Sequence, residues 1–340
     1  MNFGYRMPAE WEKHAATWLT WPHNVETWPD ILTSVEKEMV SIVAALSKSE
    51  IVRVNVLNQA HEEHVFDLLH NRVVPGTIIF HQLPTNDSWC RDYGAIFLTR
   101  DDYEEPIASL NFQYNAWGGK YLPYNLDQGV AGFMAKILLV PEFVSEMYLE
   151  GGAVDVNGVG ALITTEECLL QRNPEISCIQ IEQRLKNAFG VTQVIWLGKG
   201  LEGDDTDGHV DQLARFVSQN RVVISSEKNT KDFNYIPLMQ NRERLMNARL
   251  PDGGSIEIVE LPMPDPVYYQ NRRLPASYAN FYIANKLVLV PAFGCPQDTA
   301  AREIISECFV DRDVISVDCR SILVGLGAVH CLTQQVPWTG

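Results

Sequence analysis

Three polar segments, each placed after an apolar run typical of a β-strand, decide the expected fold: Trp89-Cys90-Arg91-Asp92, Asp204-Asp205-Thr206-Asp207-Gly208-His209-Val210-Asp211 and Gly325-Leu326-Gly327-Ala328-Val329-His330-Cys331. The apolar runs are Thr77-Ile78-Ile79-Phe80, Val194-Ile195-Trp196-Leu197 and Val314-Ile315-Ser316-Val317. A helical pattern precedes each run, at 61–71, 181–189 and 298–309. Repeated units set in a ring would point these polar ends at a common axis.

Helix-then-strand patterns recur along the whole chain, and we count five units: 34–48 with 51–56, 61–71 with 77–83, 129–138 with 144–149, 181–189 with 192–197, and 298–309 with 313–318. Two hairpins are expected, around the tight-turn pair Asn157-Gly158 and around Ser218-Gln219-Asn220. We expect residues 230–247 to form an additional helix in an insertion. The pattern predicts a single catalytic α/β domain over residues 1–340. A doubly wound sheet is the alternative, although the sequence has no glycine fingerprint for a nucleotide.

Composition excludes several classes of function. The chain has 340 residues and is 46% hydrophobic, which is ample for a large core. It has no apolar stretch near the roughly 18 residues that a membrane span needs, and its start lacks the apolar part of a signal peptide. We therefore expect no membrane partner and a cytoplasmic location. The net charge of -16 argues against nucleic acid and suits a cationic substrate. A homo-oligomer stays open.

The seven cysteines are widely scattered and include no Cys-x-x-Cys pair. This spacing favours neither a disulfide framework nor a structural zinc site. Cys331 differs from the others because Gly325 and Gly327 precede it and let the backbone approach a ligand closely. A thiol reacts as thiolate only beside a proton acceptor or a cation, so a role for Cys331 requires a nearby base.

His209 and Asp211 are the candidates for that chemistry. On a strand they would point to the same side and face one ligand, whereas His330 would point away from Cys331. Alternatively, the cluster of Asp204, Asp205, Asp207, His209 and Asp211 could bind a divalent metal. Against a metal, no second histidine has ligand spacing with His209.

Two further carboxylates stand beside backbone turns or aromatic residues. Glu150 precedes Gly151 and Gly152, and Asp92 lies three residues after Trp89. The simpler interpretations are a solvated turn residue for Glu150 and a local ion pair with Arg91 for Asp92.

Taken together, these motifs resemble a known family. The resemblance covers nearly everything from Met7 to Pro337 and rests on seven motifs: Met7-Pro8-Ala9-Glu10-Trp11-Glu12, Trp89-Cys90-Arg91-Asp92-Tyr93-Gly94, Asn115-Ala116-Trp117-Gly118-Gly119-Lys120-Tyr121, Leu149-Glu150-Gly151-Gly152, Thr206-Asp207-Gly208-His209-Val210-Asp211, Tyr278-Ala279-Asn280-Phe281-Tyr282 and His330-Cys331-Leu332-Thr333-Gln334-Gln335. The chain resembles the agmatine deiminases and related bacterial peptidylarginine deiminase-type proteins of the guanidine-modifying superfamily.

The resemblance implies a five-bladed, pseudosymmetric α/β propeller of the pentein type, with no metal and no organic cofactor. It implies that Cys331 is the nucleophile and His209 the general acid/base, with Glu150 as its partner. Asp92 and Asp211 would hold the guanidinium. Leu326 interrupts the glycines that the family often has before the His-Cys pair, and Ala95 stands where proline is usual, but no reacting group is lost.

The expected reaction is hydrolytic deimination of a small cationic guanidine substrate, with agmatine giving N-carbamoylputrescine and ammonia. We expect Trp89 and Trp117 to contact the substrate, and Asp204 or Asp205 to meet the distal amine of agmatine. Arginine and peptidylarginine are the alternative substrates, since the form of the segment around Lys120 is closer to the peptidylarginine-type branch. A metal-dependent hydrolase and a binding protein without turnover are the alternatives from other classes.

Overall fold

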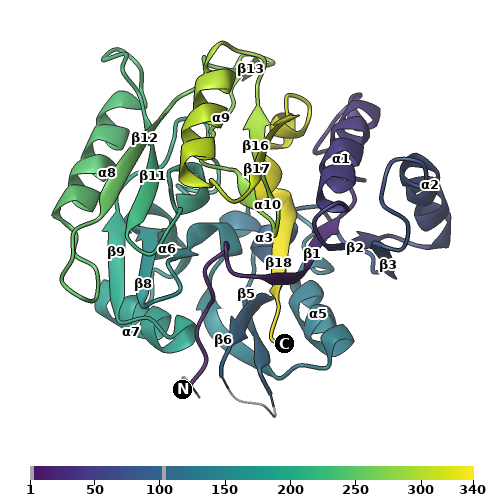
Figure 1. The fold of residues 1–340 in the computed structure, drawn as a ribbon, viewed down its shortest axis with the longest axis horizontal. Coiled ribbons are helices and arrows are strands. Elements are labelled where there is room, and N and C mark those ends of the chain that lie inside the picture. The colour runs from purple at the N-terminus through teal and green to yellow at the C-terminus, as the bar shows by residue number, and fades with distance from the viewer. Residues whose placement is uncertain (1–3, 102–104) are drawn as a thin grey trace.

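The computed structural model describes residues 4–101 and 105–340 and has a mixed α/β architecture (Figure 1). Its strands are β1 (His14–Thr20), β2 (Ile51–Val56), β3 (Ile78–Gln82), β4 (Ile96–Thr99), β5 (Ile107–Gln113), β6 (Glu142–Tyr148), β7 (Asp155–Val156), β8 (Ala161–Thr165), β9 (Gln193–Leu197), β10 (Ala214–Phe216), β11 (Arg221–Ser226), β12 (Glu257–Pro262), β13 (Tyr268–Tyr269), β14 (Arg272–Arg273), β15 (Tyr282–Ile283), β16 (Leu287–Ala292), β17 (Asp313–Asp318) and β18 (Thr333–Pro337).

The helices fall into long ones between strands and short ones near the polar segments. They are α1 (Leu32–Leu46), α2 (Gln59–Leu69), α3 (Cys90–Tyr93), α4 (Ala116–Gly119), α5 (Val130–Leu138), α6 (Glu166–Arg172), α7 (Cys178–Phe189), α8 (Tyr235–Asn247), α9 (Gln297–Cys308) and α10 (Val329–Leu332), with the 3₁₀ helices η1 (Asp127–Gly129), η2 (Gly151–Ala153), η3 (Val210–Gln212) and η4 (Ile322–Gly325).

Five sheets in the described residues share one pattern. Four of them have the orders β4-β5-β6, β7-β8-β9, β10-β11-β12 and β15-β16-β17, with an antiparallel first pair and a parallel second pair. The remaining one has the order β18-β1-β2-β3 and joins the C-terminal strand to the N-terminal one. Parallel neighbours need a crossover connection, and a long helix supplies it in each sheet: α1 and α2 in the first, then α5, α7, α8 and α9.

The predicted helices and strands are present, but the prediction of one separate unit for each helix-strand pair is wrong. The strands 51–56 and 313–318 have the expected bounds, and both expected hairpins are present as β7-β8 and β10-β11. However, the first two predicted units belong to one sheet, because β2 pairs with both β1 and β3. Residues 230–247 are no insertion: α8 is the crossover helix between the parallel strands β11 and β12.

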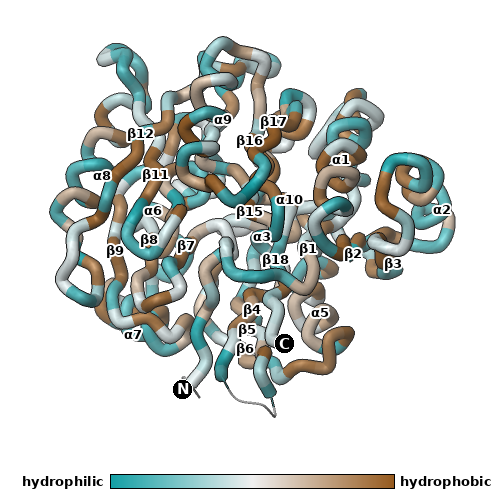
Figure 2. Tube along the Cα trace, in the orientation of Figure 1, coloured by the Kyte–Doolittle hydropathy of each residue, from teal (hydrophilic) through white to brown (hydrophobic). Residues whose placement is uncertain are grey.

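Helix α7 illustrates why these segments fold as they do. Ser177 and Gln180 form a capping box at its start, and Gly190 ends it in the left-handed conformation. Ile181, Leu185 and Phe189 recur at helical spacing and are buried in the core. Figure 2 shows the same division across the fold, with apolar segments in β9, β11 and β16. No helix in the described part of the chain is long and apolar enough to cross a membrane.

Short helices lie where the last parallel strand of a sheet has ended. Helix α3 follows β3, η2 follows β6, η3 follows β9, and α10 follows β17. Helix α3 contacts both α10 and η2, and η2 in turn contacts η3. In Figure 1, α3 and α10 lie near the middle of the view, with the long helices around them. The fold thereby gathers the polar segments of separate sheets into one place.

Candidate active site

Three of the predicted side chains converge on Gly152. A Cβ atom at this position would lie 2.6 Å from Nδ1 of His209, 2.9 Å from Oδ2 of Asp211 and 2.9 Å from Oδ1 of Asp92. The amide of Gly152 also donates to Asp92 Oδ1 at 3.1 Å. Any larger residue would have to displace all three groups, so the glycine leaves the space in which they meet.

Cys331 lies in α10, is 5% exposed, and faces the same carboxylates. Its Sγ is 3.7 Å from Oδ2 of Asp211 and accepts a hydrogen bond from Nδ2 of Asn280 at 3.2 Å. Burial raises the pKa of the Cys331 thiol well above its usual value, and the charges of Asp211 and Asp92 raise it further. These effects favour the thiol form of Cys331. A cation between the two carboxylates would favour the thiolate.

His209 sits between two carboxylates in the buried part of the site. Its Nε2 is 3.4 Å from Oε2 of Glu150, and its Nδ1 is 3.7 Å from Oδ1 of Asp92. Burial lowers the pKa of His209, but Asp92, Cys168 and Glu150 outweigh burial and raise the pKa well above its usual value. The imidazolium is thus the stable form here, so His209 has a proton to give.

Arg172 fixes the charge of Glu150. Its Nε donates to Oε1 of Glu150 at 2.7 Å, and both side chains are 1% exposed. Burial raises the pKa of Glu150, but His209 and Arg172 together lower it to about 2. Glu150 therefore stays ionised and can partner the imidazolium.

Asp92 is held by an aromatic residue from a strained loop. Trp117 donates its Nε1 hydrogen to Asp92 Oδ2 at 2.8 Å. Ala116 and Trp117 have φ values of 52° and 56°, in the left-handed region that non-glycine residues seldom adopt. Burial raises the pKa of Asp92 to about 6, and Asp211 contributes to the rise. Arg91 does not pair with Asp92 but with Glu10, so the simple ion-pair interpretation is wrong.

A set of buried side chains that the sequence analysis did not identify holds Asp211 in place. His330 places Nδ1 2.8 Å from Asp211 Oδ2 and Nε2 2.8 Å from Glu10 Oε2. Arg91 and Arg215 contact the same Glu10 carboxylate at 3.3 and 3.0 Å. Strand alternation was the wrong basis for orienting these residues. Asp211 lies in the 3₁₀ helix η3 with His209 at its start, and His330 lies in the helix α10.

A cavity of about 710 Å³ opens onto the site. Trp89, Asp92, Trp117, Asp205 and Cys331 are among its lining residues. His209, Glu150 and Asp211 are buried next to it, each at most 1% exposed. The structure thus brings together all five predicted catalytic residues, two of them on the cavity wall.

The acidic segment before His209 is less available than its sequence suggests. Asp204 is not among the cavity-lining residues of the described chain, and its Oδ1 accepts from the amide and hydroxyl of Thr206 at 2.9 and 2.6 Å. Asp205 lines the cavity but accepts from the Tyr121 hydroxyl and lies 3.6 Å from Arg272. Asp207 pairs with Lys120 at 2.7 Å and with Arg172 at 2.6 Å. The segment is therefore largely neutralised by nearby cations.

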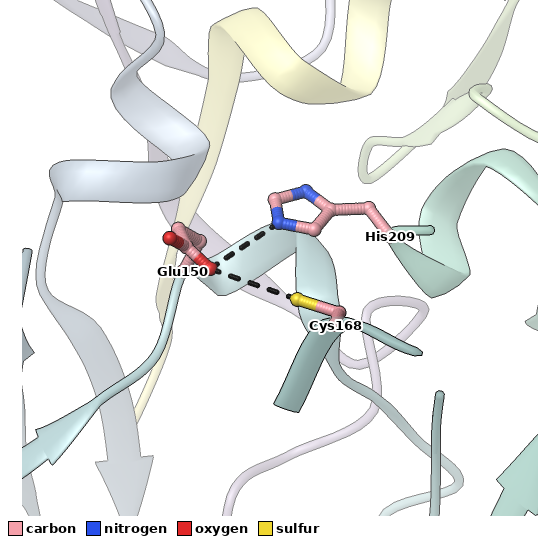
Figure 3. A group of neighbouring side chains, drawn as sticks. All are labelled: Glu150, Cys168 and His209. Carbon is pink, nitrogen blue, oxygen red and sulfur yellow. Dashed lines mark hydrogen bonds and ion pairs between the residues drawn. The ribbon is translucent and has the colours of Figure 1, made fainter. Parts of the chain in front are cut away.

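Within the described residues, one group has the composition of a metal site. Ligand atoms of Glu150, Cys168 and His209 all lie within 4.8 Å of one another (Figure 3). Asp204, Asp205, Asp207 and Asp211 do not belong to this group, so the metal cluster weighed from the sequence is not assembled. Arg172 already supplies a positive charge to Glu150, which disfavours a further cation there.

Known proteins are similar to this chain over nearly its whole length. The family of Porphyromonas-type peptidyl-arginine deiminases matches residues 6–337. The chain belongs to this family. The agmatine deiminase of Medicago truncatula is 36% identical over 369 residues, which cover 98% of this chain and 96% of that protein. The solved agmatine deiminase of Enterococcus faecalis has a TM-score of 0.90 at 30% identity, covering 98% of this chain and 96% of the other. A C. jejuni agmatine deiminase variant with substrate bound has a TM-score of 0.88 at 31% identity, covering 98% and 96%.

The resemblance inferred from the motifs is therefore confirmed. Five residues around the site had no assigned role: Glu10, Cys168, Arg172, Asn280 and His330. Three of these stand inside motifs that carried the resemblance, which is the signal that could have identified them. Cys168 and Arg172 lie in α6, outside those motifs, and reach the site only through tertiary contacts.

Proposed function

We propose that this member of the family hydrolyses the guanidinium group of a small cationic substrate, releasing ammonia and leaving a urea group. One observation carries the proposal. Asp211 Oδ1 is a buried acceptor with no hydrogen-bond partner among the described residues, and the side chains of Asp211 and Asp92 both border the space at Gly152. A buried acceptor without a donor is costly, and the N–H groups of a planar guanidinium would satisfy it.

Binding prepares the nucleophile. Asp92 and Asp211 hold the guanidinium nitrogens through charge-assisted hydrogen bonds and orient the carbon toward Cys331. The substrate charge offsets the two carboxylates that raise the pKa of the Cys331 thiol. The thiolate then forms while its proton is lost to the surroundings, and its sulfur attacks the guanidinium carbon to give a tetrahedral adduct.

His209 serves both halves of the reaction. As an imidazolium it donates a proton to one amino group of the adduct, the C–N bond breaks, and ammonia leaves. The product of this step is a thiouronium joined to Cys331. His209, now neutral, removes a proton from a water molecule that attacks the same carbon. The C–S bond then breaks, the urea product leaves, and Cys331 regains its proton. Glu150 stabilises the imidazolium in each cycle.

Agmatine is the proposed substrate, giving N-carbamoylputrescine and ammonia. Aspartates line the cavity, and free arginine would bring a carboxylate against them. Peptidylarginine is the second candidate, because the matching family carries that name and a 710 Å³ cavity exceeds the needs of a five-carbon amine.

We further propose that residues 1–340 form one catalytic domain built as a five-bladed α/β propeller. The repeated strand order of the five sheets supports this arrangement. So does the origin of the site residues: Asp92, Glu150, His209, Asn280 and Cys331 each follow the last strand of a different sheet. A single cooperative calorimetric transition is expected for one domain, and two separable transitions would contradict it.

An ammonia-release assay across agmatine, arginine and a blocked peptidylarginine tests the function. Turnover of agmatine with formation of a ureido product is expected, and Cys331→Ser should abolish it while leaving the thermal midpoint little changed. Cys295→Ser is the matched control, since Cys295 contacts Tyr278 and Asp298 away from the proposed nucleophile. Release of ammonia from none of the three substrates would refute the proposal. Loss in Cys295→Ser with retention in Cys331→Ser would refute the nucleophile.

A further inference from the structure

The side chain of Asn280 touches the sulfur of the proposed nucleophile. Its Nδ2 group lies 3.2 Å from Sγ of Cys331 and donates a hydrogen bond to it. Among the described residues, no other side chain donates a hydrogen bond to this sulfur. Asn280 is fully buried. It therefore lies beside a reacting atom, although the proposed reaction steps give it no role.

Two backbone amides determine which end of the Asn280 side chain faces the sulfur. Its Oδ1 atom accepts from the amide of His330 at 3.1 Å and lies 3.5 Å from the amide nitrogen of Cys331. If the side-chain amide were turned over, its own N–H donors would face these two N–H donors. The Nδ2 donor is thus held against Sγ by the same short helix, α10, that carries Cys331.

This contact favours the ionised form of the cysteine. A thiol can donate to Oδ1 of Asn280, which lies 3.5 Å from Sγ, or to Oδ2 of Asp211 at 3.7 Å. A thiolate has no proton to donate and instead accepts a charge-assisted hydrogen bond from Nδ2, which is stronger than a neutral one. Burial raises the pKa of the Cys331 thiol, whereas hydrogen bonds from the Ala328 backbone and from Asn280 lower it.

The charged groups around Cys331 leave this task to a neutral donor. Burial raises the pKa of the Cys331 thiol, and Asp211 from η3 and Asp92 from α3 raise it further. The two nearby imidazole rings face these aspartates: His209 lies 3.7 Å from Asp92, and His330 lies 2.8 Å from Asp211. In the described chain neither ring has a hydrogen bond to Sγ, so neither stabilises the thiolate by direct contact.

We propose that Asn280 is a further catalytic residue, whose Nδ2 hydrogen bond stabilises the Cys331 thiolate before attack and again when the sulfur is the leaving group. The inference rests on the proposed deiminase function. In the first half of the reaction the sulfur gives its electron pair to the guanidinium carbon, so the hydrogen bond lowers the cost of forming the thiolate. In the second half the C–S bond breaks and the electron pair returns to the sulfur. The same donor then stabilises the departing thiolate until it regains its proton.

Two opposing trends set the expected size of the effect. Loss of a hydrogen bond to a charged group moves the ionisation of the thiol upward by about one pH unit or more. The thiolate fraction then falls about tenfold, but a more basic thiolate is about threefold more nucleophilic. The reactivity of the free thiol should therefore fall about threefold for each tenfold loss of thiolate.

The test uses two substitutions of Asn280. Asn280→Ala removes the donor, and Asn280→Asp keeps the Oδ1 acceptor for the His330 amide but places a carboxylate oxygen against the sulfur. The acid limb of kcat for agmatine, which reports the substrate complex, should move upward by about one pH unit in Asn280→Ala and further in Asn280→Asp. Alkylation of Cys331 by iodoacetamide without substrate, measured by peptide mass spectrometry at one pH, should slow about threefold and about tenfold, respectively.

Asn157→Asp is the matched control. Asn157 is 2% exposed, and its Oδ1 accepts from the amides of Val159 and Ala161 at 3.0 and 2.9 Å. Its Nδ2 donates to the carbonyl oxygen of Gln219 at 2.8 Å. It thus makes the same kinds of contact as Asn280, but in the β7-β8 hairpin and without a sulfur. The substitution should lower the thermal midpoint and leave the kcat limb and the alkylation rate unchanged.

An acid limb that stays in place in Asn280→Ala, with kcat lowered equally at every pH, would overturn the proposal and leave Asn280 a support for α10. Unchanged or faster alkylation in both variants would also overturn it, as would an equal shift in Asn157→Asp. If Asn280→Ala does not fold, Asn280→Asp carries the same test. Absence of turnover by the unmodified enzyme would instead overturn the proposed function. Alkylation would then decide the contact alone: rates that fall from the unmodified enzyme to Asn280→Ala to Asn280→Asp support it, and equal rates refute it.

Discussion

His330 Nδ1 lies 2.8 Å from Asp211 Oδ2, so the residue next to Cys331 in the chain holds one of the two carboxylates proposed for the guanidinium. The other ring nitrogen, Nε2, faces Glu10 at 2.8 Å. Both nitrogens can donate when the ring is protonated. His330 is therefore a positioning residue, which orients Asp211 and leaves general acid/base work to His209.

We predict that His330→Ala lowers kcat/KM about ten- to hundredfold and also lowers the thermal midpoint. The substitution removes the ring nitrogen that faces the buried Asp211 carboxylate, at a cost of roughly 1–3 kcal/mol, whereas Glu10 keeps Arg91 and Arg215. Because His330 lowers the pKa of Asp211, its loss should raise that pKa, so that Asp211 gains a proton together with Asp92 and the acid limb of kcat/KM moves to higher pH. His330→Asn restores one donor and should recover part of the activity. An unmoved acid limb in both variants would mean that His330 only stabilises the fold.

Gly152→Ala should abolish most activity without unfolding the protein. The new methyl group would come within 2.6–2.9 Å of His209, Asp211 and Asp92, and small displacements of reacting groups cost about 100-fold in rate. Gly129→Ala is the matched control, because nothing lies within 4 Å of a Cβ there. Steady-state kinetics and circular dichroism on both variants check the prediction. Full activity in Gly152→Ala would contradict the convergence of the three groups at this point.

The acid limb of kcat/KM should have its midpoint near pH 6. Burial raises the pKa of Asp92 from 3.8 to about 6, so this carboxylate gains a proton and loses its hold on the guanidinium as the pH falls through that value. The hydrogen bond from Trp117 lowers the pKa of Asp92, so Trp117→Phe should move the midpoint upward. Trp338→Phe, near the exposed C-terminus, is the control. A midpoint that stays fixed in Trp117→Phe would mean that another group governs the limb.

The sequence predicted the parts of the fold that depend on local residue patterns, but not the assignment of strands to sheets. Apolar runs predicted strands such as Asp313–Asp318, and a turn-forming pair predicted the hairpin at Asn157-Gly158. Both depend on residues close together in the sequence. Sheet membership did not follow, since nothing local to α8 distinguishes a crossover helix from an insertion. The pairing of β18 with β1, which links both ends of the chain, is a tertiary fact of the same kind.

The reacting groups were predictable for a different reason. Cys331, His209, Glu150, Asp92 and Asp211 stand in short motifs, and the structure brings them together. Their partners are set by distance in space: Arg172 reaches Glu150 across 22 positions, and His330 reaches Glu10 across 320. The acidic residues before His209 made this loop look available for a substrate amine. In the structure, Lys120 pairs with Asp207 and Arg272 lies near Asp205, and both cations come from other parts of the chain.

Chelation should leave turnover unchanged. The three ligand atoms of Glu150, Cys168 and His209 are close enough for a metal, but Arg172 already binds Glu150 at 2.7 Å, and burial raises the pKa of the Cys168 thiol. A metal ion at this group would have to displace the proton of the Cys168 thiol and would lie near the positively charged guanidinium of Arg172. Dialysis against a strong chelator, followed by the ammonia assay, tests this directly. Cys168→Ala supplies the matched variant and should retain activity within about tenfold, because Cys168 contacts Glu150 and His209 but is not among the cavity-lining residues of the described chain, whereas Cys331→Ser should retain none. A large loss on chelation that a divalent ion restores, together with inactivity of Cys168→Ala, would replace the thiol mechanism with a metal-dependent one.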